Sequence, residues 1–228
     1  MRITYISHSC FVLENDVVLL FDYPSGAMLT SGAQKIVEDA VLDSKLYVFI
    51  SHSHGDHYNP DVTKMAEEAQ SVEYIVSDDV PLSIGHSLGP DEKLSLDVMD
   101  ITTYESNDAG LAFLIELGGK RIYYGGDLAK WDWDDFDVDT RRYMVKVFED
   151  MTARLSKLNI DVAFSNMDKR LESWAGPLDF LEVVKPKFFV PMHTFGHPEW
   201  IDDLVEKTEY PTERIFRYKK PGDPVELR

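Results

Sequence analysis

The sequence predicts an α/β protein with helices outside its sheets, and three observations favour this class. Short apolar runs typical of strands are interspersed with segments of helical spacing in both halves of the chain. Hydrophobic residues make up 44% of the 228 residues, enough to fill a sizeable core. No internal repeat or Ser/Gly-rich linker divides the chain, so we expect one domain over residues 1–228. The pattern leaves open whether the strands form one sheet or two.

The N-terminal half is expected to be rich in strands. Asn15 and Asp16 supply a hairpin turn between the second and third of them. Asn59 is expected to cap a helix that has Pro60 in its first position. The predicted strands are residues 3–6, 10–14, 17–21, 46–50 and 74–76, and the predicted helices are residues 33–42 and 60–69.

Strands and helices alternate more regularly in the C-terminal half. Gly118 and Gly119 are expected to form a hairpin turn, and Asp139 to cap the longest helix. The predicted strands are residues 98–104, 111–117, 121–124, 162–165, 188–190 and 214–218, and the predicted helices are residues 140–158, 178–184 and 199–207.

Composition and charge exclude several classes of function. Acidic residues outnumber basic ones 41 to 23, giving a net charge of −18, and no basic cluster is present, so neither nucleic acid nor an anionic membrane is an expected partner. No apolar run approaches the roughly 18–20 residues of a membrane span. The first residues lack the features of a secretory signal, and the single cysteine, Cys10, is expected in the core, so we predict a cytoplasmic protein. Nothing in the sequence indicates its oligomeric state.

A dense cluster of histidines follows the strand at residues 46–50. His52 and His54 are two positions apart in extended chain, so their imidazoles are expected to point to one side. Asp56 and His57 follow Gly55, where the chain must bend. Three imidazoles and one carboxylate in a small volume suit zinc or a similar divalent ion.

This H-x-H-x-D-H motif resembles that of the metallo-β-lactamase superfamily, and three further elements match in order. Residues 19–22 resemble the family's early strand that ends in an acidic residue. Residues 124–127 resemble its strand–Gly–Asp element, and residues 190–193 its late strand ending in the last histidine. Residues 8–11 further resemble the branch that contains the L-ascorbate-6-phosphate lactonases.

The resemblance implies a four-layer αβ/βα sandwich that carries metal at the sheet edge. It implies one or two zinc ions per chain, in one site of three ligands and a second of four. It also implies hydrolysis by a metal-bound hydroxide, with Asp56 orienting the nucleophile. The implied ligands are His52, His54 and Asp127 in the first site, and Asp56, His57, His193 and Asp127 in the second.

The chain departs from the family pattern at the first site. A third histidine is expected before the strand that leads to Asp127, and residues 106–110 contain none. Asn107 or Asp108 could donate an oxygen instead, which would favour manganese or iron over zinc. His197 and His86 are weaker substitutes. We therefore expect the second site to be filled more reliably.

Several other residues are candidates for the surroundings of the metal. Asp22 ends an apolar strand and is expected to accept a hydrogen bond from a ligating imidazole, rather than merely form a turn. His8 is expected either to line the pocket or to lie in an ordinary loop. Trp131 either walls the pocket or belongs to an acidic segment that precedes the long helix. Arg170 pairs either with an anionic substrate or with an acidic residue of the protein.

Three functions remain open on this basis. The first is metal-dependent hydrolysis of a small ester, lactone or phosphoester. The second is a phosphodiesterase or nuclease, which the acidity of the chain disfavours. The third is a non-catalytic metal-containing binding or sensor protein, which the missing histidine favours.

Overall fold

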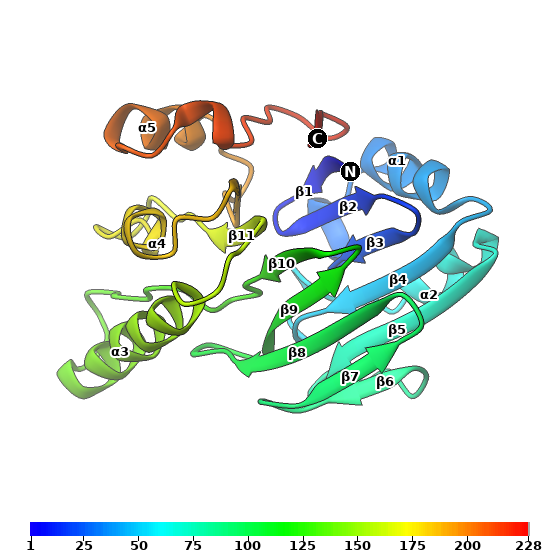
Figure 1. Cartoon of the computed structure of the whole chain (residues 1–228), viewed down its shortest axis with the longest axis horizontal. Helices are drawn as coiled ribbons and strands as arrows, with labels where there is room; N and C mark the ends of the chain where they lie inside the picture. The colour runs from blue at the N-terminus through cyan, green and yellow to red at the C-terminus, as the bar shows by residue number, and fades with distance from the viewer. Residues whose placement is uncertain (228) are drawn as a thin grey trace. The chain divides into compact units, whose positions relative to one another are not determined.

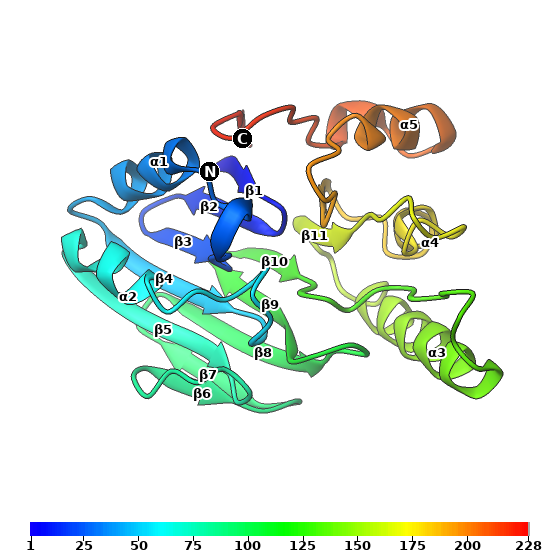
Figure 2. The same ribbon diagram turned by 180° about the vertical axis from the view of Figure 1, so that it is seen from behind.

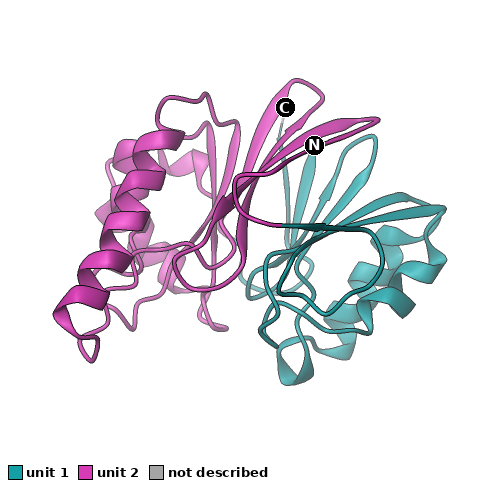
Figure 3. Cartoon of the chain, turned by 90° about the horizontal axis from the view of Figure 1, so that it is seen from below, with its two compact units in different colours: residues 1–88, 218–228 teal, residues 89–217 magenta. Residues whose placement is uncertain are grey.

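The computed structural model describes residues 1–227 and divides them into two compact units (Figure 3). Unit 1 comprises Met1–Leu88 and the C-terminal residues from Tyr218 on, and unit 2 comprises Gly89–Arg217. Each unit contains one sheet and its own helices. The choice left open by the sequence thus resolves to two sheets, and the predicted mixed α/β class is confirmed. The single domain and the stacking of four layers stay predictions.

The sheet of unit 1 is antiparallel on one side and parallel on the other. Strands β1, β2 and β3 pair antiparallel, whereas β3 to β6 pair parallel. The carboxyl ends of β3 and β4 therefore lie next to one another. Across the sheet the strands are β13 (Pro224–Glu226), β1 (Arg2–Ser7), β2 (Cys10–Glu14), β3 (Val18–Phe21), β4 (Lys45–Ile50), β5 (Ser71–Ser77) and β6 (His86–Leu88).

Buried side chains of helices in unit 1 and of its sheet form one hydrophobic core. Helix α1 begins after Thr30, whose side chain accepts a hydrogen bond from the Ala33 N–H, and its buried stripe of Ala33, Val37 and Val41 has helical spacing. It contacts β1 and β2 (Figures 1 and 2). The helical segments are η1 (Gly26–Met28), α1 (Ser31–Val41), α2 (Val62–Met65) and η2 (Ala66–Glu68).

The helix predicted over residues 60–69 is shorter than expected. Asn59 Oδ1 accepts a hydrogen bond from the Asp61 N–H, forming a turn that delays the helix until Val62. Pro60 therefore precedes the helix, and the last turn tightens into a 3₁₀ helix at Ala66.

The sheet of unit 2 combines an antiparallel meander with three parallel strands. Strands β7 to β10 pair antiparallel, and β10, β11 and β12 pair parallel. The carboxyl ends of the three parallel strands therefore meet at one edge of the sheet. Across the sheet the strands are β12 (Phe188–Met192), β11 (Val162–Asn166), β10 (Lys120–Tyr124), β9 (Leu111–Leu117), β8 (Met99–Glu105) and β7 (Lys93–Leu96).

In Figure 3 the helices of unit 2 lie to one side of its sheet. Helix α4 contacts β11, and α3 contacts α4. Asp137 caps α3 by accepting from the N–H groups of Asp139 and Thr140, so the predicted cap at Asp139 is wrong by half a turn. The helical segments are α3 (Val138–Leu155), α4 (Pro177–Val183), α5 (Trp200–Lys207) and η3 (Thr212–Arg214).

The largest errors of the sequence prediction concern edge strands. The three-residue strands β6 and β13 and the polar strand β7 carry too little apolar pattern to be recognised. The predicted strand over residues 214–218 is wrong: only Ile215 forms a bridge, with Phe189, after a 3₁₀ turn. Within residues 1–227, no helix has the length and apolar character that crossing a membrane requires.

Candidate metal centre

The histidine cluster of unit 1 gathers three potential ligands directly after β4. Residues His52, His54 and Asp56 offer ligand atoms that all lie within 4.8 Å of one another. His52 is fully buried, His54 is exposed, and the Asp56 side chain is 28% exposed. The loop thus presents a mixed nitrogen and oxygen donor set to one small space, as the spacing of the motif predicts.

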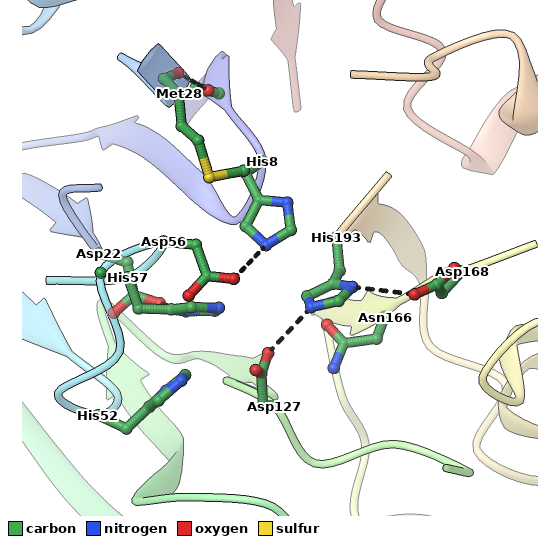
Figure 4. Close-up of polar contacts among 12 residues, drawn as sticks. His8, Asp22, Met28, His52, Asp56, His57, Asp127, Asn166, Asp168 and His193 are labelled. Atoms are coloured by element: carbon green, nitrogen blue, oxygen red, sulfur yellow. Dashed lines mark hydrogen bonds and ion pairs between the residues drawn. The ribbon is translucent and has the colours of Figure 1, made fainter. Parts of the chain in front are cut away.

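Asp22 directly follows the neighbouring parallel strand β3, and its carboxylate accepts hydrogen bonds from the start of this loop. Its Oδ1 accepts a 2.7 Å hydrogen bond from the Ser51 N–H, and its Oδ2 accepts one of 2.9 Å from Ser51 Oγ. The same Oδ2 lies 2.6 Å from His57 Nδ1 (Figure 4). A carboxylate at this distance holds the proton on Nδ1, so that His57 Nε2 keeps the lone pair that a metal requires. The contact expected of Asp22 is present.

His8 belongs to the same group of side chains rather than to an ordinary loop. It is 1% exposed, and its Nε2 lies 3.5 Å from Asp56 Oδ2. Its ring stands edge-on to that of His57, with centroids 5.4 Å apart. His8 has a φ of 51° and Asp22 one of 48°, left-handed values that non-glycine residues seldom adopt. Backbone strain of this kind is common where side chains are held for function.

Asp127 and His193 are brought together in unit 2 by the parallel strands β10 and β12. His193 Nε2 lies 3.6 Å from Asp127 Oδ1 (Figure 4). The other ring nitrogen, Nδ1, lies 3.7 Å from Asp168 Oδ2. Asp168 follows β11 and is fully buried, so unit 2 repeats the pairing of a buried carboxylate with a histidine that Asp22 forms in unit 1.

Arg170 forms an ion pair with this buried carboxylate. Its Nε lies 2.9 Å from Asp168 Oδ1 and its Nη2 lies 2.5 Å from Oδ2, a two-pronged ion pair. The guanidinium also lies 3.8 Å from the centre of the Phe195 ring. Of the two readings that the sequence allowed, the structure shows the salt bridge within the protein.

Trp131 and Asn107 hold the loop that follows Asp127. The Trp131 indole donates a 2.7 Å hydrogen bond to the Asp127 carbonyl, and its ring centroid lies 5.2 Å from that of His193. Asn107 Nδ2 donates to the Ala129 carbonyl at 2.7 Å, and its Oδ1 accepts from the Ala129 N–H at 3.2 Å. The Asn107 oxygen is thus directed at backbone, which argues against its use as a metal ligand.

Of the other suggested substitutes for the missing histidine, Asp108 lies near a candidate ligand, whereas His86 and His197 pair with glutamates elsewhere. Asp108 is exposed, and its carboxylate lies within 4.8 Å of that of Asp127. His86 pairs with Glu73 at 3.3 Å, on the edge strand β6. Half-exposed His197 pairs with Glu199 at 2.8 Å. Among residues 1–227, neither of these two histidines joins a group of three close metal-ligand side chains.

Asn166 is a site residue that the sequence analysis missed. It ends β11, is fully buried, and donates from Nδ2 to the Gly126 carbonyl at 2.9 Å, directly before Asp127. The signal that identified Asp22, a polar residue ending an apolar strand, would have found it as well.

Cys10 has no environment suited to nucleophilic chemistry. Complete burial, together with the nearby charge of Asp22, raises the pKa of its thiol well above the ordinary value. A protonated thiol is a poor nucleophile, which agrees with the predicted core role.

Known relatives match this chain over most of its length. A family model described as "Beta-lactamase superfamily domain" matches residues 2–138. A "UPF0173 metal-dependent hydrolase" of Desulforamulus reducens is 30% identical, over 85% of this chain and 84% of that protein. A protein of the same description from Archaeoglobus fulgidus is 25% identical, over 100% of this chain and 99% of that protein.

Solved structures share the fold at lower identity. The metallo-β-lactamase fold protein YhfI from Bacillus subtilis matches with a TM-score of 0.66 and 16% identity, over 98% of each chain. CmlA, a diiron β-hydroxylase from Streptomyces venezuelae, matches with a TM-score of 0.62 and 14% identity, over 99% of this chain and 54% of CmlA. At these identities the likeness concerns the fold alone.

Proposed function

Because this chain belongs to the metallo-β-lactamase superfamily, in the group of UPF0173 metal-dependent hydrolases, we propose that it is a metal-dependent hydrolase. The proposed substrate is a small ester, lactone or phosphoester. The order of the motifs in the family assigns Asp127 and His193 to the same centre as the histidines of residues 52–57. The fold hosts many chemistries, so the site must carry the argument.

The observation that carries the proposal is the buried pair of Asp22 and His57 beside the three close donors of unit 1. Imidazole and carboxylate donors suit zinc and its neighbours. Asp22 fixes the His57 tautomer with Nε2 available, an arrangement typical of metal-ligating histidines. The residues present therefore fit a divalent ion.

A divalent ion in such a site polarises the bond to be cleaved and lowers the pKa of water. The chain's own groups bind and orient. We assign to Asp56 the orientation of the attacking water, because its carboxylate is partly exposed and faces His8 at 3.5 Å. Trp131 excludes water from one side of His193, which strengthens electrostatic interactions there.

The nature of the metal is part of the proposal. Zinc is the first candidate, in one or two ions per chain. The site of Asp56, His57, His193 and Asp127 has four ligands, so we expect it to be filled more reliably than the one that lacks the third histidine. Manganese and iron stay in the test, because oxygen-rich ligation favours them, and CmlA, which matches this fold over 54% of its length, is a diiron β-hydroxylase.

The proposed partner is a small molecule in the cytoplasm rather than a nucleic acid. The net charge of −18 disfavours binding to the negatively charged phosphate backbone of a nucleic acid. The resemblance of residues 8–11 to the ascorbate-phosphate lactonase branch makes a phosphorylated lactone one substrate to try. A sensor that binds metal without turnover is the second candidate, and the missing third histidine favours it.

The test is hydrolysis by the chelated protein after reloading with Zn²⁺, Mn²⁺ or Fe²⁺. The panel contains an ester, a plain and a phosphorylated lactone, and bis(p-nitrophenyl) phosphate. We expect turnover of at least one substrate only after reloading, and its loss in Asp56→Asn but not in Asp100→Asn, a surface carboxylate on β8. Stoichiometric metal without any turnover would support the sensor instead.

A further inference from the structure

Within residues 1–227, the buried side-chain amide of Asn166 has a hydrogen bond at its nitrogen and none at its oxygen. Its Nδ2 donates a 2.9 Å hydrogen bond to the Gly126 carbonyl, which sets the direction of the whole amide group. Figure 4 shows the side chain pointing to the space beside Asp127 and His193. All three residues follow or end the parallel strands of unit 2.

The other end, Asn166 Oδ1, has no hydrogen-bond donor among residues 1–227 and no contact with solvent. A buried acceptor left in this state costs about 1–3 kcal/mol, and nearly all such atoms in native proteins have a partner. The partner of Oδ1 is therefore a group that is not part of the chain.

The neighbours of Asn166 indicate that this partner is a cation. Asp127 brings a carboxylate to the same edge of the sheet, and the exposed carboxylate of Asp108 lies within 4.8 Å of it. An anion would be repelled by these groups. An amide oxygen next to a carboxylate is a donor set that hard divalent ions accept.

Resting on the proposed function, we propose that Asn166 Oδ1 is an oxygen ligand of the divalent ion that Asp127 and His193 hold. This residue lies outside the H-x-H-x-D-H … D … H pattern. With it, oxygen donors outnumber imidazoles in the proposed ligand set of Asp56, His57, Asp127, His193 and Asn166, which makes Mn²⁺ and Fe²⁺ competitors of Zn²⁺ at this site.

Two variants separate ligation from support of the Gly126 loop. Asn166→Leu, of similar volume, removes both the amide donor and the oxygen. Asn166→Asp keeps an oxygen ligand but loses the donor to the Gly126 carbonyl. Tyr123→Phe is the matched control, because the Tyr123 hydroxyl is also buried without a hydrogen-bond partner in residues 1–227, but on β10 against the Phe180 ring.

The experiment is calorimetric titration of the chelated full-length protein with Mn²⁺ and, separately, with Zn²⁺. We expect Asn166→Leu to bind Mn²⁺ at least tenfold more weakly than the wild type, with a smaller loss for Zn²⁺. Asn166→Asp should bind Mn²⁺ as tightly as the wild type or more tightly, and Tyr123→Phe should be unchanged.

Wild-type Mn²⁺ affinity in Asn166→Leu would overturn the inference. So would equally weak binding by the Asp and Leu variants, because it would assign Asn166 to support of Gly126 alone. If Asn166→Leu does not fold, Asn166→Asp decides alone. Mn²⁺ affinity equal to or above that of the wild type supports ligation by residue 166, and weaker binding overturns it. Metal binding that follows these expectations without hydrolysis of any substrate would count against the proposed function and not against the ligand.

Discussion

Asp22 Oδ2 lies 2.6 Å from His57 Nδ1, and neither side chain has any exposed surface. The contact exists because β3 and β4 are parallel neighbours, so the residue after β3 meets the loop after β4. The carboxylate is further held by the N–H and the hydroxyl of Ser51. A buried charge with three donors around it fixes both the loop and the protonation of the imidazole.

Replacing Asp22 by Asn should therefore weaken metal binding without changing the shape of the site. The amide oxygen can still accept from the Ser51 N–H, but the NH₂ group then faces His57 Nδ1 and drives the ring proton to Nε2. We expect a 10- to 100-fold loss of Zn²⁺ affinity by calorimetric titration. Asp79→Asn is the control, because Asp79 accepts from the Ser53 N–H of the same loop. Equal affinities in the two variants would contradict this role.

Removing Arg170 should destabilise the protein through Asp168. In Arg170→Ala the fully buried carboxylate loses the guanidinium and keeps the backbone N–H of residue 170 and the 3.7 Å contact with His193 Nδ1. We expect a cost of about 2 kcal/mol, because a charged group loses its main partner. For a chain of this size the melting temperature should fall by about 4–8 °C, as followed by circular dichroism.

Two comparisons make the Arg170 result specific. Arg170→Lys should recover part of the loss, because it restores the charge but not the fork. Arg142→Ala breaks an exposed pair with Asp139 and should cost less than about 0.5 kcal/mol. A melting temperature of Arg170→Ala equal to that of Arg142→Ala would rule out the role of the buried pair.

Asn107→Ala should lower the stability of the protein even without metal. The side chain forms hydrogen bonds with the buried Ala129 N–H and carbonyl and with the partly buried Met144 carbonyl of unit 2. Losing these contacts should cost about 3 kcal/mol in equilibrium urea unfolding of the chelated protein. A residue that served only as a metal ligand would leave the unfolding of the chelated protein unchanged, and that result would refute the anchoring role.

The cap of α3 should make stability depend on acid pH. Hydrogen bonds from the side chain and backbone of Thr140 hold the pKa of the Asp137 carboxyl below its usual range. A depressed folded pKa stabilises the fold above the unfolded pKa, and this contribution is lost as pH falls through the folded value. The urea midpoint of the wild type should exceed that of Asp137→Asn at pH 6, and the difference should shrink below pH 4. A difference that does not change with pH would exclude this contribution.

Much of the fold could be predicted from the sequence because its central strands are continuous apolar runs. Strands such as β4 and β9 and the helix α1 carry unambiguous periodicity. Edge strands such as β7 are polar and short, since few of their side chains reach the core, and they escaped recognition. Whether one sheet or two would form depended on strand pairing over long distances, which local pattern does not contain.

The candidate ligands could be predicted because their spacing is close to unique. The contacts of the surrounding residues could not. Asn107 binds backbone 22 positions on, which local pattern does not contain. Arg170 binds Asp168 only two positions away, but the sequence does not show that this carboxylate is buried. Asn166 was missed because it lies outside the recognised motifs, although it is a polar residue that ends an apolar strand. Which end of its amide is bound is shown only by the three-dimensional contact to Gly126.

The most direct test of the metal centre is the metal content per chain, by elemental analysis after reconstitution with Zn²⁺ and removal of unbound metal. We predict at least one ion per chain in the wild type and in His86→Ala, whose imidazole pairs with Glu73 on an edge strand. In His57→Ala the content should fall well below one, because the buried ligand oriented by Asp22 is lost. A wild type without metal, or equal metal content in His57→Ala and His86→Ala, would contradict the account.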